Sequence, residues 1–262
     1  MELEPVKLYY KETGQGTPVV LVHGFPLNHS IWNEVATELK EHARVIMPDL
    51  RGHGRSPAPE GTYSMRLLAE DLRQLLDDLE LDRVVLVGHS MGGYACLAFA
   101  RAYPERLAGF GLIASQAEAD APERRQGRYQ TADDVKTKGV KIVAEAMAPK
   151  LTTQSELVEP LRQLMLHVAT PNGVMGSLKG MAERADATAW LSSISVPALV
   201  LAGKEDAIIP LVRAQTLAQL LGRGWLVEIE GAGHMPRCCP GGRPRSRWSP
   251  PCANCSDIFR II

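Results

Sequence analysis

Residues 84–93, Val-Val-Leu-Val-Gly-His-Ser-Met-Gly-Gly, constrain the fold of this 262-residue chain more than any other stretch. Four consecutive apolar residues predict a strand buried on both faces, and the apolar pattern of residues 91–102 predicts a helix directly after it. Between them lies Gly-x-Ser-x-Gly, centred on Ser90. A serine at such a sharp turn projects its hydroxyl clear of the sheet, and the glycines allow close backbone approach. The alternative is a glycine-rich turn with an incidental serine, which would need neither the strand nor the helix.

Short apolar runs alternate with helical patterns along most of the chain. Strands separated by helices predict βαβ units and a mainly parallel sheet flanked by helices. Alternating apolar residues between residues 6 and 10 predict an antiparallel edge strand, and Ser64 is a candidate cap for a helix that extends to residue 79. Runs that predict further buried strands lie at residues 19–22, 44–47, 111–114, 198–201 and 225–229.

One region lacks strand patterns. Residues 116–191 predict helices only, and an all-helical insertion between two strands is the layout of a lid over the carboxyl edge of a sheet. We therefore expect a core formed by residues 1–115 and 192–236, with residues 116–191 as a helical lid. The expected lid helices span residues 136–147, 156–168 and 174–184, with loops at residues 148–149 and 170–173.

These motifs resemble the α/β-hydrolase superfamily, and the resemblance covers residues 1 to about 236. The His-Gly-Phe-Pro segment at residues 23–26 is similar to the oxyanion loop of that family. Residues 49–56 resemble its D-x-R-G-x-G-x-S loop, which is structural. The resemblance is strongest to small serine esterases and lactonases, including 3-oxoadipate enol-lactonases and acyl-lactone hydrolases. It implies the α/β-hydrolase fold, with the backbone N–H groups of Phe25 and Met91 forming an oxyanion hole.

A serine nucleophile requires a base, and the base requires an orienting carboxylate. In this fold their order along the chain is serine, acid, histidine. Asp206 follows the apolar run at residues 198–201 and matches the position of the acid in the family. His234, in Gly-Ala-Gly-His after the last apolar run, matches the position of the base. The predicted catalytic residues are therefore Ser90, Asp206 and His234, although Asp206 could instead be a capping carboxylate.

The other histidines lie at positions where the family has no base. His23 and His89 are expected to support the oxyanion loop and the serine turn. His29 and His42 fall in surface-like helical contexts. His167, in the predicted lid, could line the pocket or be a solvated or core histidine.

The resemblance implies hydrolysis of carboxylic esters or lactones with small to medium acyl groups, through an acyl-enzyme and without a metal or organic cofactor. Perhydrolase or haloperoxidase-like activity, proline iminopeptidase-like activity and a low-turnover ligand-binding role remain alternatives, since one fold hosts many functions. Methionines that could line an adaptable acyl pocket, or pack as ordinary core, are Met147, Met165, Met175 and Met181.

Composition narrows the class of partners. A formal net charge of −1 and a pI near 6.7 argue against binding nucleic acid, which requires a basic face. The N-terminus lacks the pattern of a signal peptide, and no apolar run approaches a membrane span. We expect a cytoplasmic monomer or homodimer whose partner is a small-molecule ester or lactone.

Residues 237–262 do not continue the pattern of the chain. Prolines interrupt any helix there, and four cysteines, Cys238, Cys239, Cys252 and Cys255, lie close together. A zinc or disulfide site and a basic tail for an acidic partner are two hypotheses. The favoured hypothesis is a change of reading frame near residue 237, because the Arg-Pro-Gly-Cys-rich composition begins abruptly.

Overall fold

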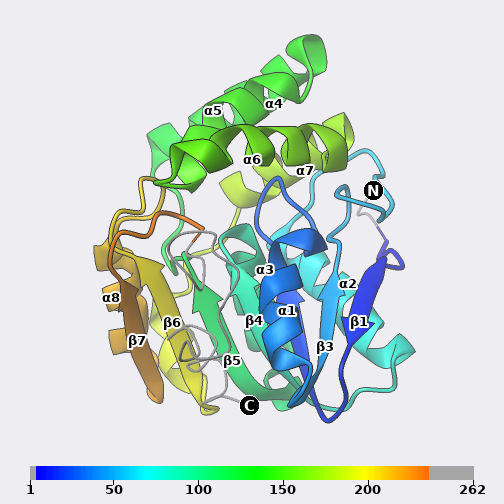
Figure 1. Ribbon diagram of the computed structural model, residues 1–262, viewed down its shortest axis with the longest axis vertical. Helices are drawn as coiled ribbons and strands as arrows, with labels where there is room; N and C mark the ends of the chain where they lie inside the picture. The colour runs from blue at the N-terminus through cyan, green and yellow to red at the C-terminus, as the bar shows by residue number, and fades with distance from the viewer. Residues whose placement is uncertain (1–3, 236–262) are drawn as a thin grey trace.

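A seven-stranded sheet organises residues 4–235, which are the residues that the computed structural model describes. The strand order is β1-β3-β2-β4-β5-β6-β7, and every pairing is parallel except that of β1 with β3 (Figure 1). The hypotheses on residues 237–262 lie outside the described residues. The strands are β1 (Tyr10–Thr13), β2 (Thr17–Val22), β3 (Ala43–Pro48), β4 (Val84–His89), β5 (Leu107–Ile113), β6 (Ala198–Gly203) and β7 (Gly224–Ile229).

The six strands predicted as apolar runs are all present, and the edge strand is shifted. It was expected between residues 6 and 10, but β1 begins at Tyr10, where it pairs with Pro48 of β3. The preceding backbone is bound to side chains instead. The Val6 N–H donates to Asp71 Oδ1 at 2.8 Å, and the Tyr9 N–H donates to Ser56 Oγ at 2.8 Å. These bonds hold residues 6–9 along the edge of the domain without a strand ladder.

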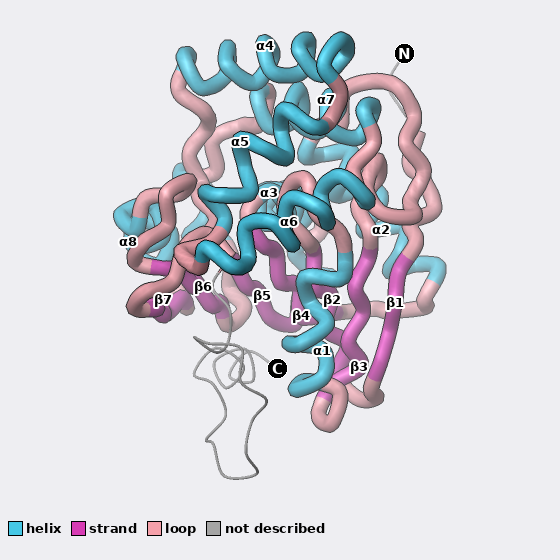
Figure 2. Tube along the Cα trace, turned by 45° about the horizontal axis from the view of Figure 1, so that its top comes forward, coloured by secondary structure: helices cyan, strands magenta, loops and turns pink. Residues whose placement is uncertain are grey.

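Helices pack on both faces of the sheet (Figures 1 and 2). Because side chains alternate along a strand, Val20 packs in the cluster with α2 and α3, whereas the adjacent Val19 packs in the cluster with α1. Ser64 caps α2 as predicted, since its Oγ accepts from the Leu67 N–H at 3.1 Å. These helices are α1 (Asn33–Leu39), α2 (Met65–Asp78), α3 (Met91–Ala102) and α8 (Leu211–Leu220), with short 3₁₀ helices η1 (His29–Trp32), η2 (Pro104–Arg106) and η3 (Thr188–Ser193).

Between β5 and β6, four helices lie above the carboxyl edge of the sheet, one more than expected (Figure 1). The additional helix, α4, escaped prediction because only Ala132 and Val135 of its residues are buried. The helix expected at residues 136–147 is divided, because Gly139, at φ 73°, ends α4. Residues 148–149, expected as a loop, belong to α5. The four helices are α4 (Pro122–Lys138), α5 (Lys141–Leu151), α6 (Ser155–Val168) and α7 (Pro171–Ala182).

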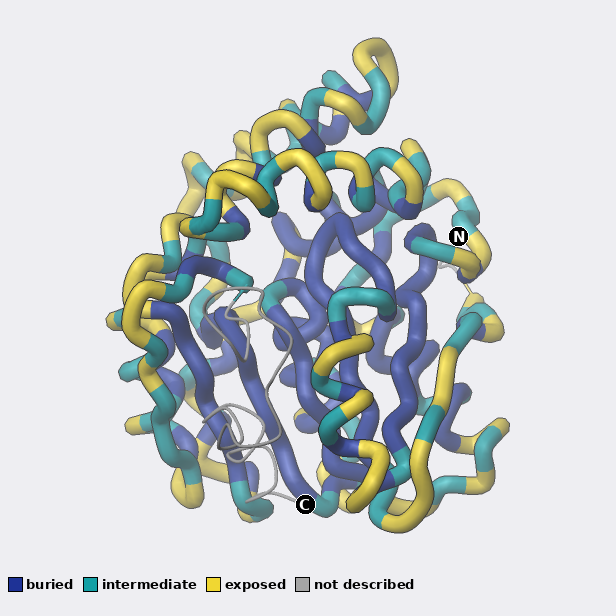
Figure 3. Tube along the Cα trace, in the orientation of Figure 1, coloured by how far each residue is buried: buried dark blue, intermediate teal, exposed yellow. Residues whose placement is uncertain are grey.

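Helix α7 attaches these helices to the core. Its glycines allow backbone contact: a Cβ at Gly173 would lie 1.9 Å from Gly52 O, and one at Gly180 would lie 1.7 Å from Tyr63 O. The Tyr63 N–H also donates to Gly176 O at 3.0 Å. The outer surfaces of α4 and α6 are exposed, while the strands β2 to β6 below are mostly buried and the edge strands β1 and β7 are partly exposed (Figure 3). Among residues 4–235, no helix combines the length and apolar character that a membrane span requires.

Candidate active site

Ser90 lies in the sharp turn between β4 and α3 that its sequence predicts. Its φ of 52° is in the left-handed region, which L residues rarely adopt. The N–H of Ser90 donates to Ile113 O at 2.8 Å, which fixes the turn to β5. A Cβ at Gly88 would lie 2.5 Å from Gly92 O, and a Cβ at Gly92 would lie 2.5 Å from His23 O. Only glycine fits at these two positions, as the motif requires.

The structure brings His234 and Asp206 to Ser90 from two distant segments. His234, only 1% exposed, follows β7 and places Nε2 2.9 Å from Ser90 Oγ. Its Nδ1 lies 2.8 Å from Asp206 Oδ2, so Nδ1 donates to the carboxylate and Nε2 is free to accept from the serine hydroxyl. Asp206 Oδ1 accepts from the N–H groups of Ile208 and Ile209 at 2.8 and 2.9 Å. The three predicted residues therefore form one continuous hydrogen-bonded chain.

The loop at residues 23–26 lies directly against the serine. A Cβ at Gly24 would lie 3.1 Å from Ser90 Cβ, and Phe25 lines the same pocket as Ser90. The Phe25–Pro26 peptide bond is cis. Met91 is the first residue of α3, so its N–H has no partner within the helix. Phe25 and Met91 thus both border Ser90, as the prediction of an oxyanion hole requires.

His23 and His89 are buried supports, in agreement with the sequence. His23 Nε2 accepts from the Leu50 N–H at 2.9 Å, so its Nδ1 carries the hydrogen and donates to Gly24 O at 2.9 Å. His89 donates from Nε2 to His234 O, also at 2.9 Å. Burial lowers the pKa of His23 to about 4 and that of His89 to about 3. Both rings are therefore neutral at pH 7 and hold the loops that flank Ser90.

The expectation of a surface position is wrong for His29 and correct for His42. Of the alternatives for His167, the structure shows a solvent-exposed side chain. His29 is buried, and its Nδ1 lies 2.6 Å from Asp49 Oδ1. Asp49 also accepts from the N–H groups of His29 and Arg55, each at 2.9 Å, which explains the structural character of its loop. The hydrogen bond to the buried Asp49 carboxylate stabilises His29 in the interior. The helical spacing of the sequence alone does not show that His29 is buried. His42 is exposed, as expected, and His167 is exposed on α6 and does not line the serine pocket.

A pocket of about 490 Å³ opens above Ser90. Helices α4, α5 and α7 contribute its outer wall, so it lies between these helices and the sheet edge. Two of the four methionines singled out from the sequence, Met147 and Met181, line it, and Met165 and Met175 do not. The apolar lining also includes Phe25, Ile142, Val143 and Leu178.

One wall of this pocket, formed by α4, carries two arginines and Asp134. Arg124 and Arg128 line it, and both pair with Asp120, as does Arg184 at 2.8 Å. Burial acts to raise the pKa of Asp120, but the hydrogen bond and charge of Arg128 and the charge of Arg184 outweigh burial and lower it. The Asp120 carboxylate therefore stays ionised beside three arginines.

Tyr94 and Arg128 are among the pocket residues that the sequence analysis did not identify. Tyr94 lies one helical turn after Ser90 on α3 and lines the pocket, so helical spacing could have identified it. Arg128 could not be found in this way, because α4 itself was not predicted.

The comparisons with known proteins agree with this fold. Residues 17–236 match the alpha/beta hydrolase fold family, and the chain belongs to that family. A solved thermophilic esterase from Thermogutta terrifontis is 42% identical, with a TM-score of 0.85 over 87% of this chain and 86% of its own. The enol-lactonase from Burkholderia xenovorans LB400 is 28% identical, with a TM-score of 0.80 over 87% of this chain and 89% of its own.

A third similarity is to a protein of another described activity. The non-heme chloroperoxidase CPO-A1 of Kitasatospora aureofaciens is 28% identical over 255 residues, which are 92% of this chain and 93% of that protein. The predicted α/β-hydrolase fold and the resemblance to esterases and lactonases are confirmed. The chain is thus a member of a hydrolase family with esterase, lactonase and haloperoxidase relatives.

Proposed function

We propose that this protein is a serine hydrolase that cleaves carboxylic esters or lactones of small to medium acyl substrates. The observation that carries the proposal is the hydrogen-bonded chain from Asp206 through His234 to Ser90, with contacts of 2.8 and 2.9 Å. Such a chain activates a serine that is otherwise a weak nucleophile. It ends in a pocket with space for a substrate of this size.

The mechanism follows from the geometry. His234 Nε2 accepts the proton of Ser90 Oγ as the oxygen attacks the carbonyl carbon, and Asp206 stabilises the imidazolium. The N–H groups of Phe25 and Met91 stabilise the developing oxyanion. His234 then gives the proton to the leaving alcohol oxygen, which leaves an acyl-enzyme. Water, deprotonated by the same histidine, releases the acid and restores the serine.

The lining and the volume of the pocket favour substrates with an apolar acyl group of limited length. Most of its lining is aliphatic or aromatic, and methionine side chains adapt to irregular shapes. The esterase and the enol-lactonase to which the chain is similar act on bonds of the proposed type, by their names.

The similarity to a chloroperoxidase favours one second activity. Hydrogen peroxide could replace water as the nucleophile that attacks the acyl-enzyme, giving a peracid from the same Ser90 ester. This activity needs the same serine, histidine and aspartate. Peracid formation in acetate and peroxide would measure it.

The test is release of p-nitrophenol from p-nitrophenyl butyrate by the full chain. We expect a burst followed by steady turnover, and a loss of roughly 10⁴- to 10⁶-fold in kcat for Ser90→Ala. Ser155→Ala, at an exposed position at the start of α6, is the matched control and should retain full activity. Undiminished activity of Ser90→Ala would overturn the proposal. Release of a single equivalent would instead indicate a ligand-binding protein with little turnover.

A further inference from the structure

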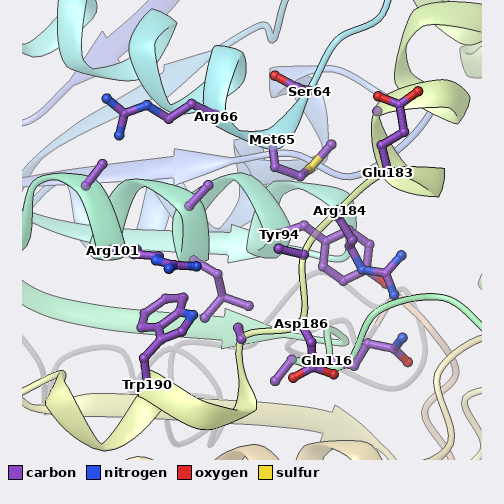
Figure 4. A pocket seen from close by; sticks show the side chains of 17 residues that line it. Ser64, Met65, Arg66, Tyr94, Arg101, Gln116, Glu183, Arg184, Asp186 and Trp190 are labelled. Carbon is purple, nitrogen blue, oxygen red and sulfur yellow. The ribbon is translucent and has the colours of Figure 1, made fainter.

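A second pocket of about 490 Å³ (Figure 4) shares the residue Tyr94 with the serine pocket. Among the described residues, Tyr94 is the only one that lines both. The second pocket is bordered by the start of α2, by α3, by residues 116–117 and by residues 180–190. Ser90 and the predicted oxyanion residues do not line it, so the proposed catalytic mechanism does not use this pocket.

Much of the lining of this pocket is apolar. Tyr94, Leu97, Ala117 and Ala187 line it, and each is less than 5% exposed. The half-buried ring of Trp190 lies at one end. Removing an apolar body from water against such a lining is favourable in proportion to the area covered. The pocket therefore suits an aliphatic or aromatic group.

Arg101 is the charged residue that distinguishes the site. Its guanidinium carbon lies 5.9 Å from the centre of the Trp190 ring. In the described part of the chain it has no ion pair or hydrogen bond, and its side chain lies beside Trp190, away from Glu183 (Figure 4). An arginine presents five donors that suit a carboxylate in bidentate geometry.

The other charged groups of the pocket already have partners. Asp186 accepts from the Thr188 N–H at 2.8 Å, and Glu183 accepts from the Tyr129 hydroxyl at 2.9 Å. Two arginines of the pocket form ion pairs. Arg66 pairs with Glu70 at 2.5 Å, and Arg184 pairs with Asp120 at 2.8 Å. Arg101 is thus the one charged group here whose donors are all available within residues 4–235.

We propose that this pocket binds an amphipathic monocarboxylate, with its carboxylate at Arg101 and its acyl or aryl body over Leu97 and Tyr94. In this arrangement the apolar body of the ligand is buried in the pocket, while its carboxylate stays at the exposed rim, where Arg101 lies. A carboxylic acid of this kind has the chemistry of the acid that the proposed hydrolysis releases. The binding site itself does not depend on that proposed function.

A ligand bound in the second pocket affects the serine pocket through Tyr94, which lines both. The guanidinium carbon of Arg184 lies 4.2 Å from the centre of the Tyr94 ring, and Tyr94 is only 4% exposed, so its side chain forms part of the wall between the two pockets. A ligand body against this ring changes the wall that a substrate contacts on the other side. We therefore expect the carboxylate to alter the KM for ester substrates more than kcat.

The test is calorimetric titration of the full-length Ser90→Ala protein with sodium 4-phenylbutyrate. This variant cannot form an acyl-enzyme, so the measurement is independent of turnover. We expect saturable binding, weakened about 10- to 100-fold by the further change Arg101→Gln, the effect of losing a charge-assisted hydrogen bond. The matched control Arg125→Gln, an exposed arginine of α4 that lines neither pocket, should leave the Kd unchanged.

Two further measurements make the result decisive. Neutral 4-phenylbutyramide should bind equally to the parent and to Arg101→Gln, because it lacks the charge that Arg101 recognises. Ala98→Phe places a ring inside the pocket and should abolish binding with an unchanged melting temperature. No saturable binding, equal affinity of the parent and Arg101→Gln, or equal weakening by Arg125→Gln would each overturn the proposal. The esterase assay of the proposed function can succeed or fail independently of these results.

Discussion

The imidazole of His89 donates its Nε2 hydrogen to the main-chain carbonyl oxygen of His234, with a separation of 2.9 Å. The two rings are also in contact, with centroids 5.1 Å apart. His89 directly precedes Ser90, so this bond joins the turn of Ser90 to the loop of His234 across 145 positions of sequence. In the proposed mechanism, His89 is therefore a positioning residue rather than a participant in proton transfer.

Replacing His89 tests this positioning role. His89→Leu removes the donor, so we expect kcat to fall about 100-fold with little change in KM, because displacements near 1 Å cost that much. His89→Gln keeps an N–H donor and should recover part of the loss. Steady-state kinetics with p-nitrophenyl butyrate checks both variants. Equal activity of His89→Leu and the parent would contradict the assignment.

Asp206 controls the tautomer of His234. Asp206→Asn retains the size of the side chain but no longer fixes the hydrogen on Nδ1, so we expect kcat to fall by about 10⁴. The matched control is Glu205→Gln, since Glu205 is adjacent and exposed. If both variants had the same kcat, Asp206 would have no part in the catalytic chain.

The stability of the protein should decline in mild acid because of three buried histidines. Burial, the largest cause in each case, lowers the pKa of His23 to about 4 and the pKa values of His53 and His89 to about 3. In the unfolded chain these side chains titrate near pH 6.5, so below that pH the unfolded state binds more protons. Their contribution is complete above about pH 6.5 and is lost as the pH falls toward 4.

The slope of the free energy of unfolding against pH measures this loss of stability. Each histidine contributes at most about 1.4 kcal/mol per pH unit, so the three together approach about 4 kcal/mol per unit below about pH 5.5 and about half of that near pH 6.5. Urea unfolding at several pH values between about 5 and 7 measures the free energy of unfolding. His89→Leu should reduce the slope by about a third, and His42→Gln, at an exposed position, should leave it unchanged. A flat profile would show that the buried rings are charged or reach water.

The buried strands, the two glycines that flank Ser90, and the positions of Asp206 and His234 could be predicted from patterns in the sequence. Four consecutive apolar residues identify β4, and only glycine fits at positions 88 and 92. Asp206 and His234 were found because each follows a buried strand at the carboxyl edge, where parallel strands bring their loops together.

The remaining features depend on contacts between distant segments. His29 is buried because Asp49, 20 residues later, binds its ring, and no periodicity shows this. Helix α4 is almost entirely polar, so its helical state depends on packing against α7 rather than on an apolar stripe of its own. The Arg101 pocket required knowing that residues 180–190 lie against α3.

Two glycines in the lid helices should respond oppositely to alanine. A Cβ at Gly180 of α7 would lie 1.7 Å from Tyr63 O, so Gly180→Ala must separate α7 from the core. We expect it to lower the free energy of unfolding by about 1–3 kcal/mol, as overpacking does. Gly127 of α4 has nothing within 4 Å of its Cβ position, and Gly127→Ala should stabilise the protein by about 0.5–1 kcal/mol. Urea unfolding of the pair checks the signs, and destabilisation by both would contradict the packing of α4.

The serine pocket should limit the length of the acyl chain. Ala146 of α5 lines the pocket and is exposed, so Ala146→Leu narrows the pocket without disturbing the core. We expect kcat/KM for p-nitrophenyl octanoate to fall about tenfold relative to the acetate, since overpacking costs 1–3 kcal/mol where the longer chain meets the added side chain. Lys150→Leu, one turn along α5 and outside the pocket lining, is the matched control and should leave the ratio unchanged. A parent enzyme whose rate rises steadily beyond the laurate ester would show instead that the acyl chain leaves this pocket, and that the lid helices do not set its length.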